Sequence, residues 1–347
     1  MTKENTVKYI IIGAGLSGLT SGYLLDKQSE ANFLILEGRN RVGGRIITKD
    51  TIDFGATWIH GPHQHILSLL DTLTIDKFVQ YSEGKNILIY NTQATPYYFE
   101  NDPNAPSSFR IYGGSNTLIN QLSANIKSHI KTNTIVSEII ENKHGVTVVT
   151  NNGNYNAEKV IVTIPPRIAS NILFTPKLPE ATLQVMKQTH TWMSNAIKIG
   201  LTFKSPFWRK NNLSGTIIGQ IGAVTELYDH SSADETRFAL MGFVNEGLRA
   251  LPADERKRTI LKHLVNCLGN EVLDYLTYEE KDWSEDKFTS CEQIHSVYLT
   301  PSYGNPIFAE SYLNNKVLFS GTETSAIHGG YMDGAIYSGI NAVHKLI

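Results

Sequence analysis

A short apolar run near the start of the sequence, residues 7–12, passes directly into the glycine-rich stretch Gly13-Ala14-Gly15-Leu16-Ser17-Gly18. A helical pattern follows. A second apolar run, residues 33–36, then ends at Glu37, 19 residues beyond Gly18. A strand, a GxGxxG turn, a helix and an acid at about this distance are together typical of a dinucleotide-binding unit. The pattern therefore predicts a β-turn-α-β unit in a parallel sheet.

Each residue of this turn has an expected task. Gly13 makes the turn, Gly15 lets a pyrophosphate approach the backbone, and Gly18 lets the helix pack on the strand. The pyrophosphate is expected at the positive end of the helix, next to Ser17. Glu37 is expected to accept a hydrogen bond from a ribose hydroxyl. A chance glycine-rich turn is the alternative, and the correctly spaced strand, helix and acid argue against it.

A second glycine pair follows in EGRNRVGGRI, residues 37–46, with arginines on both sides of it. An NAD domain has no need for these residues, whereas a cofactor with a further ribityl and ring extension does. The segment resembles that of the flavin-containing amine oxidases, in which it cradles the diphosphate and ribityl chain. The resemblance implies FAD as the cofactor, with contacts from Gly38, Arg39, Gly44 and Arg45.

The stretch DFGATWIHG, residues 53–61, is similar to a segment of polyamine and spermine oxidases that passes along the flavin ring. The resemblance implies that Gly55, Ala56 and Thr57 bring the backbone to the ring. It also implies that Trp58 shields the ring and that His60 faces the substrate cavity. In the simpler interpretation, Trp58 is a core aromatic residue and His60 is a loop histidine.

The resemblance continues to the end of the sequence. The alternating stretch from Val136 to residue 164 is similar to the middle segment of the flavin domain, where Val136 would meet the adenine. SGTETSAIHGGYMDGA, residues 320–335, resembles the monoamine oxidase flavin segment. It implies that Gly321 and Glu323 contact the ribityl or phosphate region, and that Tyr331 and Met332 lie at the flavin.

Lys198 stands in the apolar run AIKIGL. A lysine in such a run is costly to bury unless its ammonium group finds a partner. The resemblance implies that Lys198 holds a water against flavin N5 and helps the reduced flavin to react with oxygen. The alternative is a lysine that points outward from the strand.

Three departures from the family pattern affect the expected chemistry. The position of the covalent flavin attachment in monoamine oxidases falls on Glu292, one residue after Cys291, so non-covalent FAD is expected. The second tyrosine of the substrate cage falls on Gln293, which leaves Tyr331 alone. Only residues 74–109 separate the second expected helix from the next motif, so the usual helical insertion over the cavity is missing.

The fold expected from these motifs is an α/β (α+β) FAD-dependent amine oxidase fold with two domains. A Rossmann-like FAD-binding domain is assigned to residues 1–76, 111–176 and 284–347. A substrate domain with a mostly antiparallel sheet and a helix near residues 253–268 is assigned to residues 77–110 and 177–283.

The composition restricts the classes of partner that the chain is expected to bind. Lys plus Arg is 31 and Asp plus Glu is 33, a net charge of −2, which gives no case for nucleic acid. Two cysteines suggest a reducing, cytoplasmic location, and no leader, membrane anchor or metal site is expected. The expected partners are a small amine and O2, and the chain is expected to be a monomer or a homodimer.

The expected reaction is FAD-dependent oxidation of a primary or secondary monoamine or a polyamine, giving an aldehyde and hydrogen peroxide. Lys198, Tyr331, His60 and Trp58 are the expected catalytic residues. An L-amino acid oxidase is less favoured, since no arginine follows Gly55 to bind a carboxylate. A desaturase-type flavoenzyme and a non-catalytic FAD-binding protein remain as alternatives.

Overall fold

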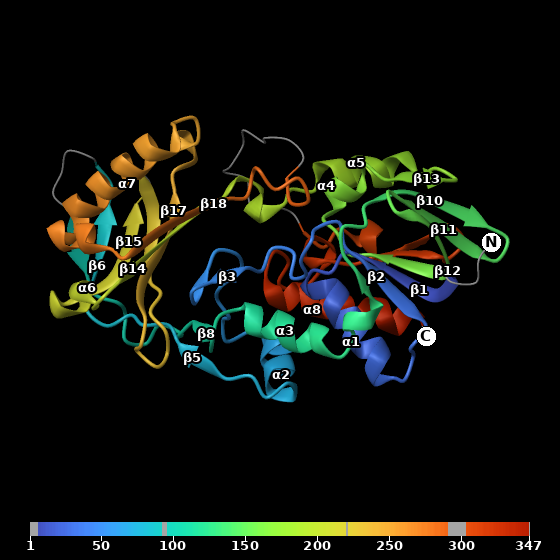
Figure 1. The fold of residues 1–347 in the computed structure, drawn as a ribbon, viewed down its shortest axis with the longest axis horizontal. Helices are drawn as coiled ribbons and strands as arrows, with labels where there is room; N and C mark the ends of the chain where they lie inside the picture. Colours follow the sequence, from blue (N-terminus) through green and yellow to red (C-terminus); the bar gives the residue numbers. More distant parts are fainter. Residues whose placement is uncertain (1–5, 92–95, 220, 291–302, 347) are drawn as a thin grey trace.

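Two β-sheets divide the molecule into two lobes, which lie side by side in Figure 1. The structure is a computed structural model that describes residues 6–91, 96–219, 221–290 and 303–346. Among these residues the sheet of the first lobe has nine strands and that of the second lobe has seven. This mixed architecture confirms the α/β (α+β) class predicted from the sequence.

The first sheet is mainly parallel at its centre. β1 pairs in parallel with β2 and β12, and β12 pairs in parallel with β20. β1 is almost continuously apolar, as expected for a strand that is covered on both faces. The strands are β1 (Thr6–Ile12), β2 (Phe33–Leu36), β9 (Ile130–Lys131), β10 (Val136–Asn142), β11 (Gly145–Thr150), β12 (Gly153–Val162), β13 (Leu173–Thr175), β19 (Ser311–Tyr312) and β20 (Val317–Phe319).

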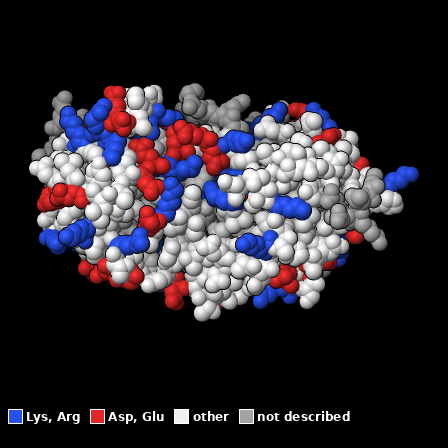
Figure 2. All heavy atoms as spheres, in the orientation of Figure 1, with Lys and Arg blue, Asp and Glu red and all other residues white. Residues whose placement is uncertain are grey.

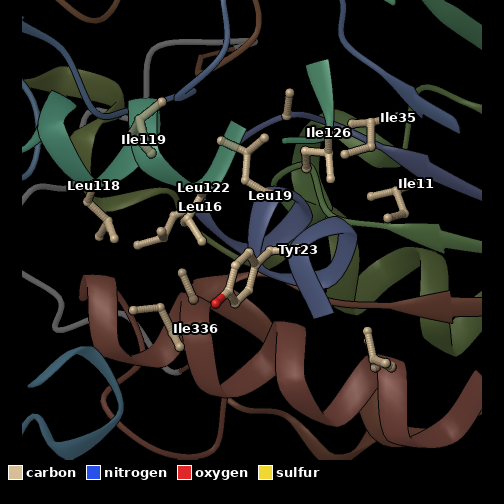
Figure 3. Close-up of a cluster of buried hydrophobic side chains, with 14 of the residues drawn as sticks. Ile11, Leu16, Leu19, Tyr23, Ile35, Leu118, Ile119, Leu122, Ile126 and Ile336 are labelled. Atoms are coloured by element: carbon tan, nitrogen blue, oxygen red, sulfur yellow. The ribbon is translucent and has the colours of Figure 1, made fainter. Parts of the chain in front are cut away.

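Helices cover both faces of this sheet. On one face, α1 (Leu16–Lys27), α3 (Asn116–Ala124) and α8 (Met332–Leu346) enclose the core of Figure 3, in which Tyr23 of α1 lies near Ile336 of α8. The other core contains Met186 of α5 (Glu180–Gln188) and Ala169 of α4 (Pro166–Ala169). Helix α2 (Gln64–Thr72) packs against α8.

The second sheet is antiparallel apart from the β6–β15 pair. Its strands are β6 (Lys85–Ile89), β7 (Tyr97–Phe99), β14 (Ile197–Phe203), β15 (Leu213–Gly219), β16 (Val224–Asp229), β17 (Phe238–Val244) and β18 (Thr277–Asp282). Helix α7 (Ala253–Leu268) buries Ile260 and Leu264 against this sheet, and the predicted helix has these bounds. Gly269, at a φ of 95°, follows the helix.

Short elements complete the chain. Two short antiparallel pairs join β3 (Thr48–Lys49) to β4 (Ile52–Asp53) and β5 (Lys77–Val79) to β8 (Phe109–Ile111). The remaining helices are α6 (Phe207–Lys210) and the 3-10 helices η2 (Lys127–His129), η3 (Trp192–Asn195), η4 (Glu246–Leu248), η5 (Asn270–Asp274), η6 (Pro306–Ala309) and η7 (Thr322–Thr324).

The region where a helical roof was expected to be missing contains strands. Between β5 and β8 the residues that the structure describes form β6 and β7 and no helix. β6 and β7 pair with each other in antiparallel orientation. The domain boundaries stay a prediction, although the strands of the second sheet come from residues 85–99 and 197–282.

The charge distribution on the surface and the apolarity of the helices both concern the partners expected for the chain. On the face shown in Figure 2, acidic and basic side chains are interspersed over the second lobe. No helix in the described part of the chain combines the length and apolarity needed to cross a lipid bilayer.

The lobes meet at the segment that leaves β4. Ile52 and Phe54 pack with Ala239 and Met241 of β17, and the indole of Trp283 donates to the carbonyl oxygen of Phe54 at 2.7 Å. The backbone that follows, residues 55–60, is thus held between the two sheets.

The turn between β1 and α1 has the geometry that its glycines predict. Gly13 has a φ of 105°, a conformation that favours glycine. A methyl group at Gly18 would lie 2.0 Å from the carbonyl oxygen of Gly13, so only glycine lets the helix approach the strand. A methyl group at Gly15 would meet nothing within 4 Å, and the φ of Gly15 is −74°.

We predict opposite outcomes for two neighbouring substitutions. Gly18→Ala should lower the free energy of unfolding by about 3 kcal/mol, because the added methyl group clashes with a backbone oxygen. Gly15→Ala is the matched control and should change it by less than about 0.5 kcal/mol. Urea unfolding of the flavin-free protein measures both. Equal destabilisation by the two variants would contradict the close packing at Gly18.

Candidate active site

A groove crosses the first lobe where four parallel strands end. Gly13 follows β1, Glu37 follows β2, Thr163 follows β12 and Gly321 follows β20, and all four line the groove. Parallel strands place their carboxyl ends at one edge of a sheet, which is where such sheets bind ligands. Helix α1 begins at the same edge, so its N-terminus faces the groove. The groove encloses about 750 Å³, its open mouth included.

Many residues that the sequence pointed to line this groove. They are Gly13, Gly15, Ser17, Glu37, Arg39, Gly44, Arg45, Ala56, Gly321, Tyr331 and Met332. A second cavity continues from it, because Glu37, Arg39, Ile164 and Phe288 line both. Gly38 and Val136 line this second cavity, at the end where the adenine is expected.

Several predicted residues do not line the groove: Gly18, Gly55, Thr57, Trp58, His60, Lys198 and Glu323. Gly55 has a close backbone neighbour instead, since a methyl group there would lie 2.0 Å from the carbonyl oxygen of Arg45. The missing side chain of Gly55 thus admits the Arg45 backbone, and the expected approach of Gly55 to the flavin ring stays a prediction.

The carboxylate of Glu37 is buried and already organised. It accepts hydrogen bonds of 2.8 Å from the backbone N–H groups of Ala14 and Arg39. A carboxylate offers about four lone pairs, so capacity remains for the ribose hydroxyl. Glu37 therefore holds the two glycine-rich turns together at the position where it is expected to meet the ribose.

Arg39 and Phe288 form one wall of the groove. The guanidinium of Arg39 donates to Asp286 at 2.9 Å and to Thr289 at 2.9 Å, and it lies over the ring of Phe288. Phe288 in turn packs on Gly38, where a methyl group would approach its ring to 2.5 Å. The glycine at position 38 thus makes room for an aromatic ring 250 residues further along the chain.

Arg45, which lines the groove, forms an ion pair with the buried Glu323. The guanidinium donates to both carboxylate oxygens, one of them at 3.0 Å, and the Glu323 side chain is 1% exposed. Such a two-point pair fixes the orientation of both side chains. The sequence had suggested that Glu323 contacts the ribityl or phosphate region directly. The pair shows that Glu323 orients Arg45, and its contact with the ribityl or phosphate region stays a prediction.

Lys198 of β14 is the most deeply buried cation of the site, with 1% of its surface exposed. Its Nζ donates to the carbonyl oxygens of Gly55 at 2.7 Å and Asp53 at 3.1 Å, and to Thr57 Oγ1 at 3.0 Å. The outward-pointing alternative is therefore wrong. Burial lowers the pKa of Lys198 to about 7, against an opposing influence of Asp53.

Trp58 belongs to a cluster with Tyr228 and Glu226, the aromatic corner, which was not predicted from the sequence. Its indole donates to Gln80 at 2.9 Å and packs edge-on against Tyr228 of β16, with ring centroids 4.7 Å apart. The hydroxyl of Tyr228 donates to Glu226 at 2.8 Å. Tyr228 and Glu226 are two residues apart on one strand and so share a face, a period-2 signal that a sequence search could have used.

His60 and Tyr331 lie next to each other, and of the two only Tyr331 lines the groove. His60 is partly buried, its Nδ1 lies 3.0 Å from Ser108 Oγ, and burial lowers its pKa. The ring of Tyr331 is 5.9 Å from that of His60 and is 49% exposed. The expected positions of His60 at the substrate cavity and of Tyr331 at the flavin stay predictions, as do their catalytic roles.

Several groove residues were missed by sequence reasoning. Thr163, Ile164, Pro165, Met193 and Thr322 line the groove, together with Phe288 and Ala335. Cys291, Glu292 and Gln293, on which the non-covalent flavin and the one-sided cage depend, lie outside the described residues. Within the described residues no group of three or more His, Cys, Asp or Glu side chains is arranged to hold a metal ion.

The groove fits a dinucleotide cofactor on its own geometry. The open space above Gly15 lies at the positive end of α1, where a diphosphate binds. Gly44, at a φ of 57°, belongs to a second turn that packs against Gly15. A methyl group added at Gly44 would lie 3.2 Å from the Cα of Gly15. Glu37, which is expected to meet the ribose, lines the groove, as do Ala56, Tyr331 and Met332, which are expected to meet the flavin ring.

Known proteins resemble the chain along its length. Residues 92–347 match the flavin containing amine oxidoreductase family, and residues 11–73 match the NAD(P)-binding Rossmann-like domain. A probable flavin-containing monoamine oxidase A of Dictyostelium discoideum is 24% identical over 448 aligned positions, covering 97% of this chain and 96% of that protein. Amine oxidase [flavin-containing] B of dog is 29% identical over 69% of this chain and 47% of its own length.

Solved structures share the fold. Cyclohexylamine oxidase from Brevibacterium oxydans superposes with a TM-score of 0.86 at 20% identity, and putrescine oxidase bound to putrescine with 0.83 at 21% identity. Each comparison covers 98% of both chains. The Dictyostelium alignment extends over 448 positions against the 347 residues of this chain, so that relative carries segments with no counterpart here. The chain therefore has the FAD-dependent amine oxidase fold and belongs to the flavin containing amine oxidoreductase family, whose cofactor is FAD.

Proposed function

We propose that this protein oxidises a small primary or secondary amine, a monoamine or a polyamine, with non-covalently held FAD. The observation that carries the proposal is the set of residues at one end of the groove. Ala56, Tyr331 and Met332 line it, and the adjoining backbone at Gly55 and Thr57 is fixed by the buried Lys198. A cofactor ring at this end would lie between a half-exposed tyrosine and a buried ammonium.

Bound FAD supplies the acceptor for a hydride from the carbon next to the amine nitrogen. The chain contributes a surface that favours the neutral amine, because aromatic faces and desolvation disfavour an ammonium ion. Tyr331, which lines the groove, provides that surface. Hydrolysis of the imine would give an aldehyde, and reoxidation by oxygen with hydrogen peroxide as the product is chemistry that bound FAD would supply. No side chain is required as a general base.

The substrate class stays open between monoamines and polyamines. Solved structures with the same fold are those of putrescine oxidase and cyclohexylamine oxidase, which represent both classes. A specific observation favours substrates with two ammonium groups. Glu226 is partly buried, shares a face of β16 with Tyr228 and acts electrostatically on Lys198. A carboxylate near the aromatic corner would attract a second ammonium group at the far end of a diamine.

The alternatives have less support. An L-amino acid oxidase needs a cation for the substrate carboxylate, but Arg39 and Arg45 are paired with Asp286 and Glu323. A desaturase-type enzyme or a non-catalytic FAD-binding protein would not respond to amines. A cytoplasmic location and either a monomer or a homodimer remain part of the proposal.

Anaerobic addition of amines to the yellow protein tests the reaction directly. We expect loss of the oxidised-flavin absorbance with a primary or secondary amine and no loss with an L-amino acid. Readmission of oxygen should restore the absorbance with one equivalent of hydrogen peroxide. If no amine reduces the flavin, the non-catalytic FAD-binding protein would be favoured. If an L-amino acid reduces the flavin and amines do not, the amino acid oxidase would be favoured.

Glu226→Gln should separate the two amine classes. If Glu226 attracts a second ammonium group, the variant should lose about tenfold in kcat/KM for putrescine, because its charge is removed while its shape is kept. Activity on a monoamine such as butylamine should change by less than about twofold. Glu255→Gln on helix α7, an exposed carboxylate of the same lobe, is the control. Equal losses on both substrates would reject the assignment.

Lys198→Met should slow reoxidation of the flavin by oxygen much more than its reduction by the amine. The Lys198 pKa of about 7 means that the group is an ammonium below pH 7 and neutral above it. Because a cation stabilises the negative charge that develops on oxygen, reoxidation of the wild type should slow as the pH rises through 7. The variant should be slow at every pH. Stopped-flow reoxidation measures this, and an unchanged pH profile in the variant would contradict the role.

A further inference from the structure

Asp333 stands in the first turn of α8 with its carboxylate fully buried. One oxygen accepts from the backbone N–H of Ile66 at 2.9 Å, in the first turn of α2. The other lies 2.7 Å from Nδ1 of His328 and 3.1 Å from Nδ1 of His65. A carboxylate accepts hydrogen bonds, so both imidazoles must carry a proton on Nδ1.

His63 lies at the centre of a cluster of four rings. Its ring centroid is 4.8 Å from that of His328, 4.8 Å from that of Tyr331 and 5.1 Å from that of His60. The backbone N–H of His60 donates to Nδ1 of His63 at 3.2 Å, so the proton of His63 is on Nε2. Burial lowers the pKa of His63 to about 4, which keeps the ring neutral and able to pack like an aromatic ring.

His328 joins the carboxylate to the loop that carries Tyr331. It adopts a φ of 46°, a conformation that few residues other than glycine and asparagine accept readily. Its carbonyl oxygen accepts from the backbone N–H of Tyr331 at 3.1 Å. A methyl group at Gly334 would lie 2.3 Å from the same oxygen, so the loop is folded tightly onto the start of α8.

We propose that Asp333 is a positioning residue, which sets the place of the Tyr331 ring through His328 and His63. This inference rests on the proposed function, because it gives Tyr331 the task of contacting the amine. Asp333 does not line the groove, and its two oxygens are occupied by protein donors. It therefore acts through the rings. Tyr331 is half exposed on one side and is supported by imidazoles on the other.

Two substitutions break this support at different points. Asp333→Asn keeps the shape and the bond to Ile66, but its amide hydrogens oppose the Nδ1–H groups of the imidazoles. His328→Asn keeps a residue that tolerates the positive φ but removes the ring that packs on His63. Each should lower the second-order rate constant for flavin reduction by an amine about tenfold. The dissociation constant of FAD should stay within twofold, because Arg45 and Glu37 are untouched.

A double-mutant cycle with Tyr331→Ala decides whether the effect passes through the tyrosine. In the Tyr331→Ala background, Asp333→Asn and His328→Asn should cause no further loss, since the group they position is gone. Losses that add in full would overturn the proposal, as would single variants with unchanged rates. His129→Asn is the matched control. Its Nδ1 also lies within hydrogen-bond distance of an acceptor, the carbonyl oxygen of Phe33, and its ring stacks on Phe33 away from the groove.

A measurement independent of turnover guards against variants that fail to fold. In 15N spectra of the histidine rings of the wild-type holoprotein, His328 and His65 should carry their proton on Nδ1 and His63 on Nε2. The opposite tautomer at His328 or His63 would overturn the network. If no amine reduces the wild-type flavin, the proposed function fails, and the histidine tautomers still decide whether Asp333 organises the rings.

Discussion

The buried ammonium group of Lys198 constrains both lobes at once. An unpaired charge in an apolar sheet would cost several kcal/mol, so the acceptors of residues 53–57 must converge on it. Those acceptors belong to the segment that leaves the first lobe, while Lys198 belongs to the sheet of the second. The contact therefore fixes the backbone next to Ala56 at one end of the groove. The positions of Trp58 and of the aromatic corner on β16 follow from it.

Prediction from the sequence was most accurate for elements in which a motif determines both the chemical groups and the local backbone conformation. The runs at residues 7–12 and 33–36 became β1 and β2 because an apolar run next to a glycine turn has few other folds open to it. The helix near residues 253–268 was predictable from its apolar face. The groove positions of Gly15, Glu37 and Arg39 follow from motif spacing, although their contacts with FAD stay predictions.

What could not be predicted depends on side chains that meet across long stretches of sequence. Phe288 reaches the groove only because Gly38 admits its ring, and neither residue carries a signal of the other. Glu323 faces Arg45, so its charge is used to orient a guanidinium. The neighbourhood of Glu226, Tyr228 and Trp58 requires β16 to face the segment after β4. Such juxtapositions are decided by packing, to which a single sequence gives no direct access.

The groove also has a consequence for the order in which the chain can fold. Its walls come from both extremes of the sequence: Arg45 pairs with Glu323, α1 packs on α8, and β12 separates β1 from β20, as the blue and red segments of Figure 1 show. During synthesis, β1 and α1 leave the ribosome long before their partners exist. Their apolar faces therefore stay exposed to solvent or bound to a chaperone until residues 317–346 have been synthesised. Cofactor capture is then among the last steps of biogenesis, and a nascent chain stalled before β20 should be unable to retain flavin.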